Sequence, residues 1–108
     1  MKMETVMDEY ETLVIFRKCK RYGNVLAIFP EEAGTKAWFK DCLAYMGNGQ
    51  SGVFDLDKID GTSSPHKKEY QALYDELVWL GYRLKLIKRV QVSHMAKRKT
   101  EVENRNGQ

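Results

Sequence analysis

The glycines between Gly47 and Gly52 are spaced as in loops that bind phosphate. The stretch reads GNGQSG, the G-x-G-x-x-G pattern of dinucleotide-binding turns and kinase phosphate loops. In dinucleotide-binding folds these glycines join a strand to a helix whose N-terminus holds the phosphates. The following residues, VFDLDKIDG, are too few and too rich in aspartate for that helix, and the kinase H-R-D motif is absent. We therefore expect a turn and no nucleotide cofactor.

Asp55, Asp57 and Asp60 precede Gly61 in a pattern close to the start of an EF-hand calcium loop. That loop needs oxygen ligands at its odd positions, glycine at the sixth and glutamate at the twelfth. Here the third aspartate and the glycine each come one residue late, and His66 stands in the last position. We expect these aspartates to form turns, and we expect no metal site.

The thiols and imidazoles of the chain do not form a catalytic or metal-binding pattern. Cys19 and Cys42 lie far apart, without a C-x-x-C pair or a Cys/His cluster, so neither zinc nor a disulfide framework is indicated. Cys42 and His66 have no local signature of a nucleophile and its base. We therefore expect no catalytic residues and a protein that is not an enzyme.

Positive charge is the strongest remaining signal. Seven cations and no acid lie between Arg83 and Lys99; this exceeds the net charge of +3, so the rest of the chain is net acidic. Such asymmetry indicates a polyanionic partner. The cations expected to contact DNA or RNA are Arg17, Lys18, Lys20, Arg21, Arg83, Lys85, Arg89, Lys97 and Arg98.

Tyrosines near these cations could stack on nucleobases. We expect Tyr22 and Tyr45 to take this role, because proteins that bind single strands combine cations with aromatic faces. In the alternative interpretation the cations serve solubility and protect a strand edge from aggregation. The protein would then be an interaction module, an adaptor or a homodimer that pairs through an open edge of the sheet.

The sequence of the first half of the domain predicts mainly strands. Two apolar runs, 13–16 and 25–29, flank a polar turn with Gly23 and Asn24, which predicts a β-hairpin. Pro30 lacks the N–H of a central strand, so we expect the second strand to end there. Residues 37–46 fit a helix or a strand, and the apolar run ending in glycines favours a strand over 42–46. Residues 47–64 are expected to be turns.

A helix follows the turns. Ser64 is a suitable N-cap, Pro65 suits the first helical position, and Gly81 is suited to end the helix. Between them apolar residues recur with helical spacing. This stripe consists of Tyr70, Leu73, Tyr74, Leu77 and Val78.

The sequence after the helix, YRLKLIKRVQV, alternates in polarity as in an antiparallel strand with one solvated face. We therefore predict a single α+β domain over 12–92: a small antiparallel sheet in β-β-β-α-β order with one amphipathic helix on one face. The opposite face, or its edge, carries Arg17, Arg83, Lys85 and Arg89. Residues 1–11 are predicted to be a partly ordered acidic lead-in and residues 93–108 a polar, disordered tail.

Length and hydropathy bound the remaining possibilities. A chain of 108 residues has room for one ordinary domain. No run of 18 or more apolar residues occurs, and the N-terminus is acidic without an apolar h-region. We therefore expect a cytoplasmic protein with no membrane span and with two reduced thiols.

Three segments read together have the pattern of a known group of proteins. They are VIFRKCKRYGNVLAIFPEE, CLAYMGNGQ and EYQALYDELVWLGYRLKLIKRV, and they cover most of residues 13–90. The set resembles a family of small proteins of bacteriophages and bacterial mobile elements that has no established function. The resemblance implies an intracellular accessory protein of mobile DNA, which suits a nucleic-acid partner and equally a small adaptor for a host protein. It also implies that Gly49 and Gln50 belong to a turn of that family.

Overall fold

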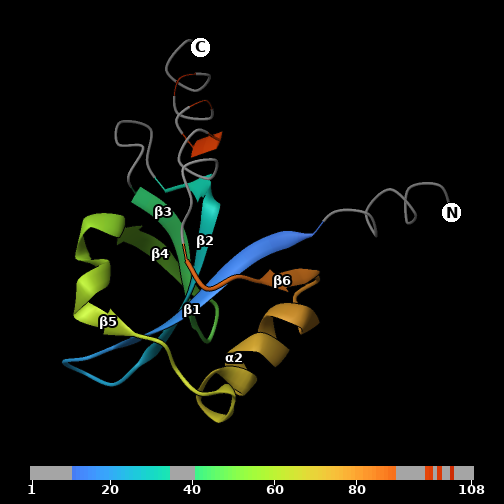
Figure 1. Ribbon diagram of the computed structural model, residues 1–108. Helices are drawn as coiled ribbons and strands as arrows, with labels where there is room; N and C mark the ends of the chain where they lie inside the picture. The colour runs from blue at the N-terminus through green and yellow to red at the C-terminus, as the bar shows by residue number, and fades with distance from the viewer. Residues whose placement is uncertain (1–10, 35–40, 90–96, 99, 101–102, 104–108) are drawn as a thin grey trace, which may run out of the picture.

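The computed structural model describes residues 11–34, 41–89, 97, 98, 100 and 103. In this part of the chain the elements form one curled sheet with a helix packed against it (Figure 1). In chain order the elements are β1 (Thr12–Cys19), β2 (Val25–Ala33), β3 (Asp41–Gly47), β4 (Gln50–Asp55), the 3-10 helix η1 (Leu56–Gly61), β5 (Thr62–Ser63), α2 (Lys67–Trp79) and β6 (Leu84–Leu86).

The sheet is mostly antiparallel and has the order β4-β3-β2-β1-β5, with β6 as a further partner of β1. This confirms an α+β fold with a small antiparallel sheet and a helix on one face. The predicted β-β-β-α-β order is wrong in detail, because β4 and β5 also precede the helix. Both extra strands fall within residues 47–64, for which the sequence predicts turns.

The first hairpin is confirmed. β1 pairs with β2, and the turn closes with Gly23 at φ +77°, its N–H donating to the carbonyl of Cys19 at 2.8 Å. Pro30 does not end β2, which continues to Ala33. The register between β2 and β3 shifts between Phe29 and Ala33, and Pro30 is tolerated at this irregularity, where a regular ladder N–H is not needed.

The stretch GNGQSG forms the tight hairpin between β3 and β4. Gly47 pairs with Gln50, and the two residues between them, Asn48 and Gly49, have φ of +54° and +77°. Positive φ at both central residues is the type I′ turn that Asn-Gly favours. The strand expected over 42–46 is confirmed as β3, and the glycine pattern joins two strands, not a strand and a helix.

Helix α2 starts later than predicted. Its N-cap is His66, whose backbone N–H donates to Oε1 of Glu69 at 2.8 Å, so Ser64 and Pro65 lie in the preceding connection. Its end is as expected: Gly81 has φ +110°, and its N–H donates to the carbonyl of Val78. Together with a bond from the N–H of Tyr82 to the carbonyl of Leu77, this forms a Schellman motif.

The final strand was expected to be antiparallel, but β6 runs parallel to β1. β5 pairs with Lys18 and Cys19, whereas β6 pairs with the segment that begins at Thr12. Helix α2 therefore carries the chain back to the beginning of β1, and β6 enters from the same end as β1 does. The described strand is also short, and residues 90–92 of the prediction lie outside the described residues.

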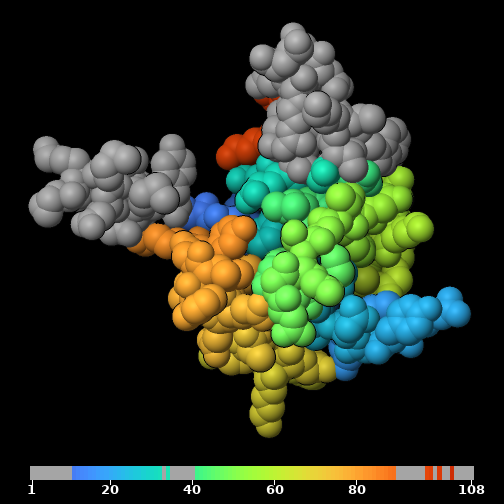
Figure 2. Space-filling view, turned by 180° about the vertical axis from the view of Figure 1, so that it is seen from behind, coloured from blue at the N-terminus to red at the C-terminus, as the bar shows by residue number. Residues whose placement is uncertain are grey.

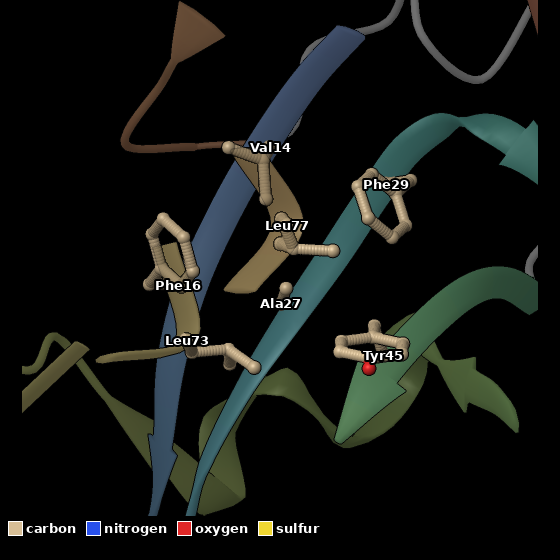
Figure 3. Close-up of a cluster of buried hydrophobic side chains, with 7 residues drawn as sticks. All are labelled: Val14, Phe16, Ala27, Phe29, Tyr45, Leu73 and Leu77. Carbon is tan, nitrogen blue, oxygen red and sulfur yellow. The ribbon is translucent and has the colours of Figure 1, made fainter. Parts of the chain in front are cut away.

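The main core lies between the sheet and α2. Alternate residues of β1 and β2 and Tyr45 of β3 point toward Leu73 and Leu77 of the helix (Figure 3). The buried members are Val14, Phe16, Ala27, Phe29, Tyr45, Leu73 and Leu77. Tyr70 and Tyr74 pack against this core, but Val78, which belongs to the predicted stripe, is 46% exposed.

The opposite face of the sheet carries a second, smaller apolar cluster. Its buried members are Ile15, Ile28 and Cys42, and Leu56 of η1 is among the side chains that pack against them. This face is therefore not an open basic surface. Among the helices that the structure describes, none is long and apolar enough to cross a bilayer.

Candidate nucleic-acid interface

The edge of β1 that faces away from β2 has two short partners with a gap between them. β6 pairs with Thr12 to Val14, and β5 pairs with Lys18 and Cys19. Phe16 is midway between these two ladders, and neither pairs with it. A groove of about 440 Å³ opens at this gap, and we call it the edge groove.

The edge groove is built by three segments that are distant in the sequence: β1, the connection from β5 into α2, and the residues around the end of β6. Its apolar lining comes from Ile15, Phe16, Pro65, Tyr70, Leu86 and Ile87. Its polar lining comes from Ser64, His66, Lys67 and Lys88. Lys67 and Lys88 are exposed, so two cationic groups lie beside an apolar interior.

Two aromatic rings form part of the groove lining. The rings of Phe16 and Tyr70 are stacked, with centroids 4.5 Å apart and planes inclined by 4°. Phe16 belongs to the buried core, whereas Tyr70 is half-buried. The aromatic lining is therefore anchored in the main core and fixed in orientation.

Arg17, a predicted nucleic-acid contact, is bonded within the protein. Its Nε donates to Oγ1 of Thr62 at 2.8 Å, and its Nη2 donates to the carbonyl of Thr62 at 3.0 Å. Its Nη1 donates to Oγ of Ser64 at 3.0 Å. Arg17 thus holds β5 and one wall of the edge groove in place.

Lys18, another predicted contact, forms an ion pair with Glu69 in the first turn of α2. The hydrogen bond from Lys18, followed by the backbone N–H of His66, lowers the pKa of Glu69 below its usual range. The carboxylate beside the groove is therefore ionised at neutral pH and already has a cationic partner.

The tip of the β1–β2 hairpin presents cations beside an exposed ring, and it projects from the body of the molecule (Figure 2). Tyr22 is 74% exposed, and Cζ of Arg21 lies 5.3 Å from the centroid of its ring. Lys20 is exposed as well, and its Nζ donates to the carbonyl of Asp60 at 3.0 Å. We call Lys20, Arg21 and Tyr22 the hairpin tip.

Tyr45, the other tyrosine predicted to stack on nucleobases, lies in the main core and not at the hairpin tip. It is 7% exposed, and its hydroxyl donates to Oε2 of Glu76 and accepts the N–H of Gly49 at 2.7 Å. The hydrogen bond to Glu76, together with burial, raises the pKa of Tyr45 above its ordinary value. Its ring packs in the main core and ties the β3–β4 hairpin to α2.

The predicted cations near β6 are placed at the far end of β1 from the hairpin tip. Lys85 pairs with Leu13, and this position is about 23 Å along the strand from Lys20. Arg83 and Lys85 are exposed there. Arg89 is also exposed and directly follows Lys88 of the edge groove. The expected single basic surface is thus divided between the two ends of β1.

Of the predicted tail, the structure describes Lys97, Arg98, Thr100 and Glu103, all with helical backbone. Lys97 is paired with Glu31 at 3.2 Å. Arg98 is buried, and its guanidinium donates to the carbonyl of Pro30. These contacts place Lys97 and Arg98 against β2 and give both side chains partners within the protein.

Sequence reasoning missed the groove residues Ser64, Lys67 and Lys88. Lys67 and Lys88 carry the charge that marks a basic cluster, but they are 21 positions apart and only the fold brings them together. Ser64 precedes Pro65 as a helix cap would, so the sequence predicts a capping role and gives no sign that Ser64 lines the groove. The available signal was the position of Lys88 in the alternating segment that was predicted to form the last strand of the sheet.

The aspartates of the calcium-like stretch have a structural role. Oδ1 of Asp55 accepts the N–H of Asp57 at 2.9 Å, which caps η1. Among the described residues, no group of three or more His, Cys, Asp or Glu side chains is arranged to hold a metal ion. Comparisons with known proteins gave no matching family model, no matching curated protein and no matching solved structure.

Proposed function

We propose that the protein is a non-enzymatic accessory protein of a mobile element that binds single-stranded nucleic acid with little sequence specificity. The observation that carries this proposal is the hairpin tip, where an exposed tyrosine follows two exposed cations. Proteins that bind single strands use this combination, because bases stack on the ring and phosphates bind the cations. The resemblance to proteins of mobile elements is compatible with this partner, as it is with a host protein.

The cations of the edge groove extend this surface. Phe16, beside the groove, and Lys20, at the hairpin tip, are four residues or roughly 13 Å apart along the strand. Lys67 and Lys88 lie on the groove, and Arg89 follows them. A strand bound to the tip would reach the groove by passing over the two-residue strand β5, which covers the edge of β1 between them.

The test is titration of fluorescent single- and double-stranded oligonucleotides at several salt concentrations, using the full chain. The test variant is Lys20→Ala/Arg21→Ala/Tyr22→Ala. We expect it to bind at least tenfold more weakly. Its salt dependence should also be shallower, because the slope falls by about 0.7 for each phosphate that the protein no longer neutralises. Single strands should bind more tightly than duplexes, because stacking needs an exposed base.

The matched control is Arg83→Ala/Lys85→Ala, which removes the same number of charges at the other end of β1. Circular dichroism and thermal unfolding establish that both variants are folded. Equal loss of binding in the control would locate the effect in total charge and not at the hairpin tip. Absence of binding by the unaltered chain at low salt would reject the proposal.

A protein-interaction module is the second candidate, and one observation favours it. Trp79, at the end of α2, is 82% exposed, and its neighbours Val78 and Leu80 are 46% and 47% exposed. Exposed aromatic residues of this kind are frequent anchors of protein interfaces. A shift of the sedimentation coefficient with concentration, abolished by Trp79→Ser, would support a homodimer through this patch.

A further inference from the structure

The edge groove contains main-chain polar groups that the sheet leaves unused. Along β1 the even-numbered residues point their N–H and C=O toward the groove edge: the N–H of Thr12 donates to the carbonyl of Arg83, and the carbonyl of Val14 accepts the N–H of Ile87. The N–H of Lys20 donates to the carbonyl of Gly61 on the same edge. By this alternation, the N–H and C=O of Phe16 face the groove.

These two groups have no ladder partner among the described strands. Pairing with β6 reaches Val14 and pairing with β5 begins at Lys18, so Phe16 is skipped. Pro65, which lines the groove beside it, has no N–H to offer. Unpaired main-chain groups at a sheet edge are available to an added hydrogen-bonding partner, and Phe16 itself lines the groove. A ligand with an adjacent donor and acceptor would supply both bonds.

We propose that the edge groove binds one unstacked nucleobase of a single-stranded nucleic acid, an inference that rests on the function proposed above. The Watson–Crick or Hoogsteen edge of most bases carries a donor beside an acceptor, which matches the N–H and C=O of Phe16. The base faces would contact the apolar lining, to which Tyr70, Pro65 and Ile87 contribute.

The size and charge of the groove fit this occupant. Its volume of about 440 Å³ lies within the usual range of small-ligand sites and exceeds what one base needs. Lys67 and Lys88 are exposed at the groove, where the phosphates that flank a bound base would lie. Glu69, the carboxylate nearest to Lys67 in sequence, is neutralised by Lys18 and so does not repel those phosphates.

The inference is tested with two single-stranded oligonucleotides of equal length and charge, one with normal bases and one with abasic sites. Because the tip residue Tyr22 also stacks on bases, the comparison is made in the Tyr22→Ala background. We expect the normal oligonucleotide to bind more tightly, by about 5- to 150-fold, the range of one stacked base. The variant Ser64→Trp, which fills the groove from an exposed position, should abolish this difference.

A second pair of variants separates the groove from charge in general. Lys67→Ala/Lys88→Ala removes two groove cations, and Lys68→Ala/Lys85→Ala removes two exposed cations that do not line the groove. We expect the first pair to weaken binding several-fold more than the second. In ¹H–¹⁵N spectra, the amide of Phe16 should shift on addition of the normal oligonucleotide and not of the abasic one.

The outcomes distinguish failure of the base site from failure of the proposed nucleic-acid function. Equal affinity for both oligonucleotides, with the Phe16 amide unmoved, would overturn the base site and leave the proposed nucleic-acid function intact. A shift of the Phe16 amide that persists in Ser64→Trp would also overturn it. Binding of neither oligonucleotide at low salt, in the unaltered chain, would overturn both the proposed function and the base site.

Discussion

The guanidinium of Arg17 holds Thr62 by two hydrogen bonds, one to its hydroxyl at 2.8 Å and one to its carbonyl at 3.0 Å. The hydroxyl of Thr62 in turn donates to the carbonyl of Ile59 at 2.6 Å. A single side chain of β1 thereby fixes the two-residue strand β5 and the end of η1. A third hydrogen bond, from Nη1 of Arg17 to Oγ of Ser64, reaches a residue that lines the edge groove.

Replacing Arg17 should therefore cost stability. Thr62 is buried, and Arg17→Ala leaves its carbonyl and hydroxyl without their charged donor. Hydrogen bonds to charged groups contribute about 1.5–3 kcal/mol, and we expect the free energy of unfolding in urea to fall by that amount. Arg21→Ala, which removes an exposed cation of the same type, should change it by less than about 0.5 kcal/mol.

A double-mutant cycle checks the cause. Thr62→Val removes the hydroxyl partner of Arg17, so the losses from the two single variants should not add. We expect a coupling energy of about 0.5–3 kcal/mol, as for residues in one hydrogen-bond network. Strict additivity would show that Arg17 does not act through the hydroxyl of Thr62.

The ion pair between Lys18 and Glu69 should govern stability in acid. The pKa of Glu69 is lowered below its ordinary value of 4.5, chiefly by the hydrogen bond from Lys18. A carboxyl with a depressed pKa contributes stability that is present above its unfolded pKa and lost as the pH falls through the folded one. The urea midpoint should therefore decline below about pH 4.5, and Lys18→Met should flatten this decline.

Lys20→Met is the matched control for this pH profile, because Lys20 bonds a carbonyl and no carboxylate. It should leave the acid decline unchanged. If Lys18→Met and the unaltered chain lose stability in parallel between pH 3 and pH 6, roughly the range in which carboxyls titrate, then Glu69 is not the group responsible.

The turn between β3 and β4 allows a test of the backbone conformation at Gly49. Gly49 has φ +77°, a conformation that costs other L-residues about 1–2 kcal/mol, so Gly49→Ala should destabilise by that amount. Gly61 has no positive φ, and a Cβ there would meet no atom within 4 Å. Gly61→Ala should be neutral within about 0.5 kcal/mol, and equal losses in both would contradict the turn assignment.

Much of the fold was predictable because the signals were local. The first hairpin and the end of α2 each depend on a glycine, Gly23 and Gly81, whose positive φ the sequence pattern anticipated. The start of α2 was not predictable in this way, because Ser64 and His66 are both candidates for the N-cap. Ser64 accepts a hydrogen bond from Arg17, and Glu69 instead caps the N–H of His66.

The missed strands show where local reasoning ends. β4 is largely polar and contains Gly52, yet the Asn48-Gly49 dipeptide before it is a strong hairpin signal that was available. β5 has two residues and depends on Arg17, 45 positions away from Thr62. No pattern within β5 could have indicated it.

The candidate site likewise has one part that the sequence indicated and one part that it did not. The hairpin tip was identified because its cations and Tyr22 are contiguous in the sequence. The edge groove was not, because it depends on the register that leaves Phe16 between β5 and β6. The parallel direction of β6, which brings Lys88 toward the groove, follows from the length and position of α2 and not from residues 84–86 themselves.

The two thiols should differ sharply in reactivity. Burial raises the pKa of Cys42 to about 11, while Cys19 lies half-buried at the end of β1. Only a thiolate reacts readily with a disulfide reagent, so Cys42 should stay protonated and inert at pH 8. We expect one thiol per native chain to react promptly, and the second only after denaturation. The prompt reaction should vanish in Cys19→Ser and persist in Cys42→Ser, and the reverse assignment would contradict the burial of Cys42.

The raised pKa of Cys42 also predicts how stability depends on pH. Because the folded pKa is raised, the stability that Cys42 contributes is complete below its ordinary pKa of 9.0 and declines as the pH rises toward 11.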